Sequence, residues 1–176
     1  IEFIDSLRSQ NVDRVFVPSV ENGLKTACID GILAGYNVVD VKIDFYDGKQ
    51  HPVDSKDIAF QTAGKHAFLE AFMSAKPGLL EPITNIEVTV PEDYMGDVMG
   101  DISSRRGKIM GMGSQGAFQQ IKAQVPQSEM YHYSTTLRSL TGGRGIHSEA
   151  LSHYEEVPRD MEAKVTASAK AAQEEN

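Results

Sequence analysis

Residues 38–55 read VVDVKIDFYDGKQHPVDS, and this stretch decides the fold of the first part of the chain. Apolar side chains alternate with polar ones from Val39 to Phe45, which is typical of a half-buried β-strand. The Asp-Gly pair that follows interrupts the alternation. The closing Asp-Ser pair is a candidate N-cap for a helical pattern that starts at Lys56. The stretch therefore predicts a strand, a short polar loop with a histidine, and a helix that holds the loop in place.

Helical patterns on both sides of this strand provide apolar faces that can cover it. The face of the first helix consists of Val20, Leu24, Ala27 and Cys28. The face of the second helix, from Lys56 to about Ala75, consists of Phe60, Ala63, Ala67, Phe68, Ala71 and Phe72. The second face is wide enough to cover a sheet. Residues 1–7 alternate weakly and predict a further strand.

An internal repeat with an offset of 35 residues occupies the second half of the chain. Its matching pairs include Val90 with Val125, Met95 with Met130 and Gly107 with Gly142. Each unit reads strand, Val-Pro, helix, glycine, strand, and two such units in tandem describe a ferredoxin-like split βαβ plait. A solenoid is less suitable because two copies cannot cap a stack. We expect both plait helices on one face of the sheet, with Met95 and Met130 buried at equivalent positions.

The predicted fold class is α+β, and the predicted domain boundaries lie at Pro82 and Pro158. Pro82 separates a first domain, residues 1–82, from the plait, residues 83–158. The remaining residues 159–176 are rich in Ala, Lys and Glu without a clear apolar stripe. They predict a frayed helix or a disordered tail.

Composition excludes several classes of protein. The net charge of −8 and the lack of a basic region argue against a binder of naked polyanions. A single cysteine, Cys28, excludes an internal disulfide framework and a cysteine-based zinc site. No apolar run is long enough for a membrane span, and no signal peptide opens the chain, so we expect a cytoplasmic protein without a membrane partner. The start at Ile1, without an initiator methionine, suggests a piece of a longer protein.

No motif for covalent chemistry stands out, so we expect no catalytic residue, no metal site and no cofactor in this chain. None of the Gly-Lys pairs is followed by the Ser or Thr of a phosphate-binding loop. The glycine-rich segment at 111–116 joins two predicted strands and is better explained as a hairpin turn. Residues 141–145, TGGRG, follow a helix and predict its C-cap. The five histidines lack the spacing of metal ligands.

Two polar clusters remain as candidate sites. One is the loop that contains His51, although a histidine in a loop is more often without function. The other concentrates positive charge at Arg105, Arg106 and Lys108, at the end of a predicted plait helix. Cations there favour the helix dipole, whereas adjacent arginines are also suited to bind phosphate. Sequence alone gives these two explanations about equal weight.

Nearly the whole chain resembles the C-terminal part of translational GTPases of the elongation factor G type. The segments that carry the resemblance are LAGYNVVDVK, DG-x-x-HPVDS, KPGLLEPI, VPEDYMGDVMGDISSRRG, LRSLTGGRG and HYEEVP. The resemblance implies that the first domain is domain IV without its first strands, a ribosomal-protein-like fold with a left-handed βαβ crossover. It implies that the second is domain V, a ferredoxin-like plait. The domain that binds GTP and Mg²⁺ would lie outside this chain, which itself would not be an enzyme.

The function implied by the resemblance is that of a ribosome-engaging arm that promotes tRNA–mRNA translocation. The expected partners are rRNA of both subunits, the tRNA anticodon arm and other domains of the same parent chain, which is expected to be a monomer. Two tip loops would enter the decoding centre, and they comprise Arg8, Ser9, Gln10, Asn11, Lys49, Gln50 and His51. The rRNA-contact candidates of the plait are Arg105, Arg106 and Lys108.

Two alternatives stay open at this stage. Ser9-Gln10 stands where many relatives have a glycine pair, and Tyr131-His132 where Phe-Gly is usual. These departures leave room for a paralogue that acts in ribosome recycling or ribosome protection. A different class of function is a small-molecule regulatory module, since ferredoxin-like plaits often have that role.

Overall fold

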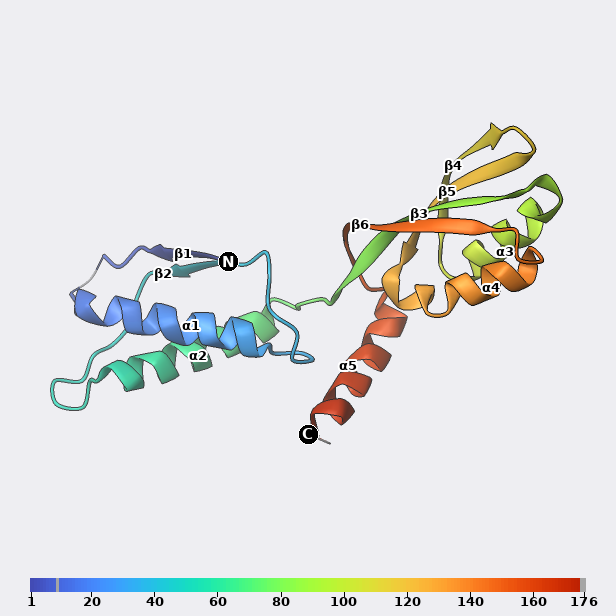
Figure 1. Ribbon diagram of the computed structural model, residues 1–176. Coiled ribbons are helices and arrows are strands. Elements are labelled where there is room, and N and C mark those ends of the chain that lie inside the picture. Colours follow the sequence, from blue (N-terminus) through green and yellow to red (C-terminus); the bar gives the residue numbers. More distant parts are fainter. Residues whose placement is uncertain (9, 175–176) are drawn as a thin grey trace. The chain divides into compact units, whose positions relative to one another are not determined.

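The computed structural model describes residues 1–8 and 10–174, and in the last helix it leaves out the side chains of residues 170 and 172–174 (Figure 1). The chain divides into two compact units, residues 1–78 together with 158–176, and residues 79–157. The first unit contains β1 (Glu2–Asp5), the 3-10 helix η1 (Arg14–Phe16), α1 (Val17–Asp30), β2 (Lys42–Phe45), α2 (Asp57–Ser74) and α5 (Arg159–Glu174). The second contains β3 (Leu80–Pro91), η2 (Glu92–Tyr94), α3 (Met95–Ser104), β4 (Lys108–Gln115), β5 (Phe118–Pro126), η3 (Gln127–Met130), α4 (Tyr133–Leu140) and β6 (Ile146–Glu156). The predicted α+β class is confirmed.

A parallel pair of strands and two long helices form the N-terminal part of the first unit. β1 pairs with β2 from Glu2 opposite Lys42 to Asp5 opposite Phe45, and α1 lies between the two strands in the sequence. This is the βαβ crossover for which the resemblance implies a left-handed connection. Pro18 lies in the first turn of α1, where proline is favoured. The predicted inner face of α1 is buried, and it includes Val20, Leu24, Ala27 and Cys28.

The two long helices of the first unit approach closely at a glycine. A Cβ atom added to Gly23 in α1 would lie 2.1 Å from the backbone oxygen of Gln61 in α2. The same two helices are joined by a hydrogen bond in which Ser19 Oγ donates to Asp57 Oδ1 at 2.8 Å. This contact fixes α2, and with it the loop that precedes α2.

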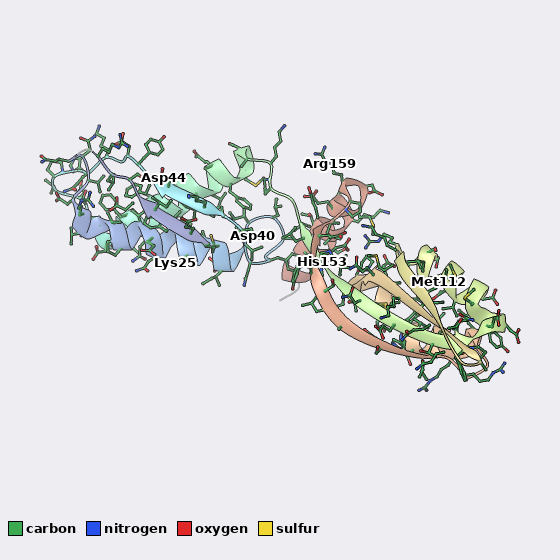
Figure 2. All side chains as sticks on the ribbon, turned by 90° about the horizontal axis from the view of Figure 1, so that it is seen from above. Lys25, Asp40, Asp44, Met112, His153 and Arg159 are labelled. Atoms are coloured by element: carbon green, nitrogen blue, oxygen red, sulfur yellow. The ribbon has the colours of Figure 1, made fainter. Side chains whose placement is uncertain are left out.

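Two predictions for the central stretch are wrong in detail. β2 begins at Lys42 rather than Val39, because Asp40 has a left-handed backbone with φ of 55° that breaks the extended conformation (Figure 2 labels Asp40). Val39 is consequently exposed. The N-cap of α2 is Lys56, without a side-chain cap, because the predicted cap Ser55 instead accepts a hydrogen bond from the backbone of His51.

The wide face of α2 is covered only in part. Phe60 and Phe68 are buried, but Ala63, Ala67 and Ala71 are exposed. Together with β2 they border an open, largely apolar groove of about 690 Å³. The expectation that this face covers a sheet therefore holds for the phenylalanines and not for the alanines.

The second unit, all of whose residues are described, is the predicted plait. Its sheet has the order β4-β5-β3-β6 with antiparallel neighbours, and α3 and α4 lie on the same face of it (Figure 1). Met130 is buried, as predicted from the repeat, whereas Met95 packs against the same core but is only half-buried, so the predicted burial is confirmed for Met130 and only in part for Met95. The core between sheet and helices consists mainly of Ile86, Val88, Val90, Val98, Ile102, Ile121, Val125, Tyr133 and Leu137.

Three boundaries in this unit differ from the prediction. β3 already begins at Leu80, so Pro82 lies inside it, at a position that pairs with β6 but not with β5. The hairpin turn falls at residues 116–117, and β4 continues through residues 113–115. The helix predicted in the second unit of the repeat is not continuous and consists of η3 followed by α4.

The chain after Pro158 is helical where a frayed helix or disorder was predicted. α5 extends from Arg159 to Glu174 (Figure 1; Figure 2 labels Arg159). Its first turn contains Asp160 and Glu162, and acidic side chains favour the N-terminus of a helix.

Candidate functional site

The two predicted tip loops of the first unit are joined through Gln50. The backbone N–H of Gln50 donates to Asn11 O at 3.1 Å. The Gln50 side chain accepts from the backbone N–H of Asp13 at 2.7 Å and donates to Asp13 Oδ2 at 2.8 Å. One neutral amide therefore satisfies backbone and side-chain groups of the opposite loop. Sequence reasoning did not identify Asp13, because nothing in the sequence shows which residue Gln50 would meet.

The floor of the tip is formed by residues that flank these loops. Asp47 Oδ1 accepts hydrogen bonds from Asn11 Nδ2 at 3.4 Å and from the backbone of Gly48 at 2.9 Å. Val12 is 3 % exposed, and a Cβ atom at Gly48 would lie 2.8 Å from its side chain. The two loops therefore pack on a buried valine, which gives the tip a defined conformation.

A hydrogen bond fixes the backbone of His51, whereas its imidazole ring is exposed. Its backbone N–H donates to Ser55 Oγ at 2.9 Å, and its side chain is 66 % exposed. Nδ1 lies 3.4 Å from the backbone nitrogen of Val53 and 3.4 Å from Asp54 Oδ2. A neutral ring can accept from Val53, whereas a protonated ring can donate to Asp54. In both cases Nε2 is left for solvent or for a partner outside the described residues.

The other predicted tip residues are exposed cations and polar groups. Arg8, Gln10, Asn11 and Lys49 are exposed, whereas Ser9 lies outside the described residues. Within the described part of the chain, neither Arg8 nor Lys49 has a carboxylate at ion-pair distance. The tip therefore presents two available cations and one imidazole, on loops fixed by hydrogen bonds. Such groups can contact RNA phosphates and base edges, but they do not form a catalytic arrangement.

Arg105 is used inside the plait. Its Nε donates to Asp101 Oδ2 at 2.9 Å, and its Nη2 donates to Thr136 Oγ1 at 3.2 Å. Nη1 donates to the backbone oxygen of Glu129, and the guanidinium lies 5.1 Å from the ring centre of Tyr133. With a side chain only 16 % exposed, Arg105 links α3 to η3 and α4.

Arg106 forms a second internal link. Its two terminal nitrogens donate to Glu81 Oε1 and Oε2 at 2.7 and 2.8 Å, and Nε donates to Glu129 Oε1 at 3.2 Å. The hydrogen bonds to Glu81 raise the pKa of Arg106 above its already high usual value. Its backbone has φ of 60°, a conformation that favours glycine, so these contacts hold an arginine in an unfavourable conformation.

The geometry therefore favours a structural role for the arginine pair over phosphate binding. Both guanidinium groups are satisfied by carboxylates or carbonyls of the same unit, which argues against their selection as rRNA-contact candidates. Lys108 differs, because its side chain is 69 % exposed and lies 3.5 Å from Glu155. Lys108 is the member of the cluster that an external anion can reach.

Other kinds of site are not indicated in the described part of the chain. The residues described contain no group of three or more His, Cys, Asp or Glu suited to hold a metal ion. A search of the same residues finds no helix with the length and apolar character to cross a membrane. Cys28 is 1 % exposed, and burial raises the pKa of its thiol.

Comparison with known proteins identifies both units. Residues 1–76 match the family described as elongation factor G, domain IV, and residues 78–165 match the family described as elongation factor G C-terminus. Elongation factor G of Aquifex pyrophilus is 54% identical over 164 residues, which cover 93% of this chain and 24% of that protein. A crystal structure of a Thermus thermophilus protein superposes with a TM-score of 0.82 at 36% identity, over 97% of this chain and 26% of the other. The chain thus spans about a quarter of the length of these relatives. With both units matched in order, this chain belongs to the elongation factor G family.

Proposed function

We propose that this chain is the ribosome-engaging C-terminal arm of an elongation factor G-type GTPase, and that it promotes movement of tRNA and mRNA. The support is membership of the family together with the two-loop tip of the first unit. The parent is proposed to be a cytoplasmic monomer, with GTP and Mg²⁺ bound by a domain outside this chain. The arm itself carries out no covalent step.

The observation that carries the proposal is the rigid connection of the two tip loops through Gln50. A part that acts by occupying space must keep its position under load. Here Gln50 and Asp13 make paired hydrogen bonds, and Gly23 and Ser19 fix α2 behind the loop. The exposed Arg8, Lys49 and His51 side chains then supply polar contacts to tRNA and rRNA.

The test separates movement from nucleotide hydrolysis in the full-length factor. His51→Ala should slow single-round translocation, while ribosome-stimulated GTP hydrolysis stays near the wild-type rate. Its stability should change by no more than about 0.5 kcal/mol, because the ring is exposed. Gln50→Ala should slow translocation as well, with a stability loss of about 1 kcal/mol from the lost loop contacts.

Lys25→Ala is the matched control. Lys25 is an exposed cation on α1 that is paired with Glu21, and it does not belong to the tip loops (Figure 2 labels Lys25). It should leave both rates unchanged. Equal losses of translocation and hydrolysis in the His51 variant would assign that residue to general ribosome binding. No loss of either rate would refute the proposed role of the tip.

A further inference from the structure

A β-bulge interrupts the pairing of β6 with β3. Ile83 of β3 lies opposite His153, but the next residue, Thr84, lies opposite Leu151, so Ser152 is an extra residue in β6. Successive side chains of a regular strand point to opposite faces of the sheet, and a bulge breaks this alternation. Ser152 and His153 can therefore approach each other, although they are neighbours in the sequence (Figure 2 labels His153).

Beside the bulge, polar side chains form one connected array. Ser152 Oγ lies 2.8 Å from His153 Nδ1, and His153 Nε2 lies 2.8 Å from Glu155 Oε1. Glu155 Oε2 in turn lies 3.5 Å from Lys108 Nζ. The hydrogen bond from His153 lowers the pKa of Glu155 below its usual value, and the charge of Lys108 acts in the same direction. Glu155 is therefore a carboxylate at neutral pH.

The charge of Glu155 determines which nitrogen of the His153 ring carries the proton. A carboxylate only accepts hydrogen bonds, so His153 Nε2 carries the hydrogen that it donates to Glu155. In a neutral ring Nδ1 is then unprotonated, and it accepts the hydrogen bond of the Ser152 hydroxyl. A hydroxyl bonded to a base whose other nitrogen is oriented by a carboxylate is the arrangement that activates a serine as a nucleophile.

Two further groups of the plait complete the surroundings of the hydroxyl. Gln124 of β5 places its Nε2 3.5 Å from Ser152 Oγ, and the same nitrogen donates to Asn85 Oδ1 at 3.1 Å. An amide N–H beside a nucleophile can stabilise the negative charge that develops when the nucleophile attacks a carbonyl group. Lys108, with a side chain that is 69 % exposed, can attract an anionic reagent. Ser152 is half-buried and His153 is exposed, so a small molecule can reach both from solvent.

We propose that Ser152 is a modification site that accepts an acyl group from small acyl phosphates, with His153 as the base and Glu155 as the residue that orients it. Ser152 Oγ forms a bond to the acyl carbon while its proton passes to His153 Nδ1. The bond between that carbon and the phosphate oxygen then breaks, and His153 gives the proton to the departing phosphate. The products are a serine ester and inorganic phosphate. This site is separate from the proposed movement of tRNA and mRNA, in which the arm carries out no covalent step.

The experiment incubates this chain with acetyl phosphate and follows acetylation of each residue by mass spectrometry. Ser148, an exposed serine on the same strand, is the internal standard. Ser152 should gain an acetyl ester about tenfold faster than Ser148, because a positioned base assists its attack. Hydroxylamine should remove this label, since it cleaves esters more readily than amides. Ser152→Ala should lose the label without a change at Ser148.

Variants of the other members of the array test their roles. His153→Gln should remove the advantage of Ser152 over Ser148, and Glu155→Gln should reduce it. Labelling of Ser152 should be slower at about pH 5 than at about pH 8, because a protonated imidazole cannot accept the serine proton. Charged groups near the ring are Glu155, Lys108 and, opposite Glu155 on β3, Glu81, which is paired with Arg106. Lys108→Ala should slow labelling by acetyl phosphate, because it removes the cation that attracts the anionic reagent.

Three results would overturn the inference. Equal rates of acetylation at Ser152 and Ser148 would show that the array does not activate the hydroxyl. An unchanged rate in His153→Gln, in a protein that melts at the wild-type temperature, would exclude His153 as the base. An acetyl group on Lys108 that resists hydroxylamine, in place of the ester on Ser152, would assign the reaction to the lysine. Each of these results would leave the proposed role in translocation untouched, because the experiment contains no ribosomes.

Discussion

Replacement of Arg106 by alanine tests whether the arginine pair is structural. The side chain of Arg106 is 26 % exposed and that of its bidentate partner Glu81 is 14 % exposed. Arg106→Ala removes three hydrogen bonds and leaves the Glu81 carboxylate mostly buried without its cation. The plait should lose stability even though the substitution creates no cavity in its apolar core.

The magnitude follows from the degree of burial. Removing one partner of a fully buried ion pair costs about 3–5 kcal/mol, and an exposed pair contributes up to about 1 kcal/mol. The intermediate exposure of Arg106 and Glu81 places the loss at about 2 kcal/mol, or about 8–16 °C in Tm for a domain of this size. Arg106→Gly should lose about 1 kcal/mol less than Arg106→Ala, because glycine tolerates the φ of 60°.

The assay is thermal and urea unfolding of both variants together with Glu81→Gln and the Arg106→Ala, Glu81→Gln double variant. A coupling energy of at least about 1 kcal/mol is expected between the two positions, since they share two hydrogen bonds. Arg105→Ala provides a comparison at the neighbouring position. A change of Tm below about 2 °C in Arg106→Ala, joined with weaker ribosome binding, would refute the structural role and restore the phosphate contact.

Three further predictions concern stability. Tyr133→Phe should raise the free energy of unfolding by about 1 kcal/mol, because the buried Tyr133 hydroxyl has no hydrogen-bond partner among the described residues. Burial raises the pKa of this phenol, so the wild-type protein should keep its full stability below about pH 10 and lose stability as the pH rises further. Thermal melts at alkaline pH should not show this loss in the phenylalanine variant. His132→Gly should stabilise the plait by about 0.5–1 kcal/mol in urea melts, because His132 has φ of 56°, and a lower Tm would contradict this. Gly23→Ala should destabilise the first unit by about 2 kcal/mol or more, since the methyl group would overlap the backbone of Gln61, and an unchanged melt would show that the helices can separate.

Side-chain periodicity was enough to predict most of the fold. The apolar positions of α1 recur at helical spacing, and Val20 and Leu24 are each 5 % exposed. In the plait, the repeat that relates Met95 to Met130 is sufficient to specify four antiparallel strands with two helices on one face. These features depend on which residues are apolar and on their spacing, and both are visible in one sequence.

Backbone conformation was less accessible, because it depends on residues that seldom adopt the angles they have here. Asp40 and His132 have φ of 55° and 56°, and neither is a glycine. Asp40 ends the extended segment before β2, and His132 separates η3 from α4. The sequence patterns continue smoothly through both positions, and they therefore predict longer elements than the structure has.

The sequence suggested an anion site at Arg105 and Arg106 because the residues that pair with Arg106 in the structure are distant along the chain. Arg106 meets Glu81 and Glu129, which are 25 and 23 residues away along the chain. No local sequence pattern predicts that Arg106, Glu81 and Glu129 meet. Two adjacent arginines at the end of a helix are, in contrast, typical of a phosphate contact. The same limit applied to Gln50, whose contact with Asp13 spans 37 residues.

Under the proposed function, the geometry of the tip and its attraction to RNA should respond differently to salt. The tip is held by a neutral amide, Gln50, bonded to backbone and carboxylate groups, so its rigidity should respond little to ionic strength. In contrast, any attraction of the exposed Arg8 and Lys49 side chains to RNA phosphate is screened by salt. Raising the salt concentration should therefore weaken association before it loosens the tip. Once bound, a factor with a wild-type tip should translocate at a rate that depends less on salt than its binding does, because position rather than attraction limits that step.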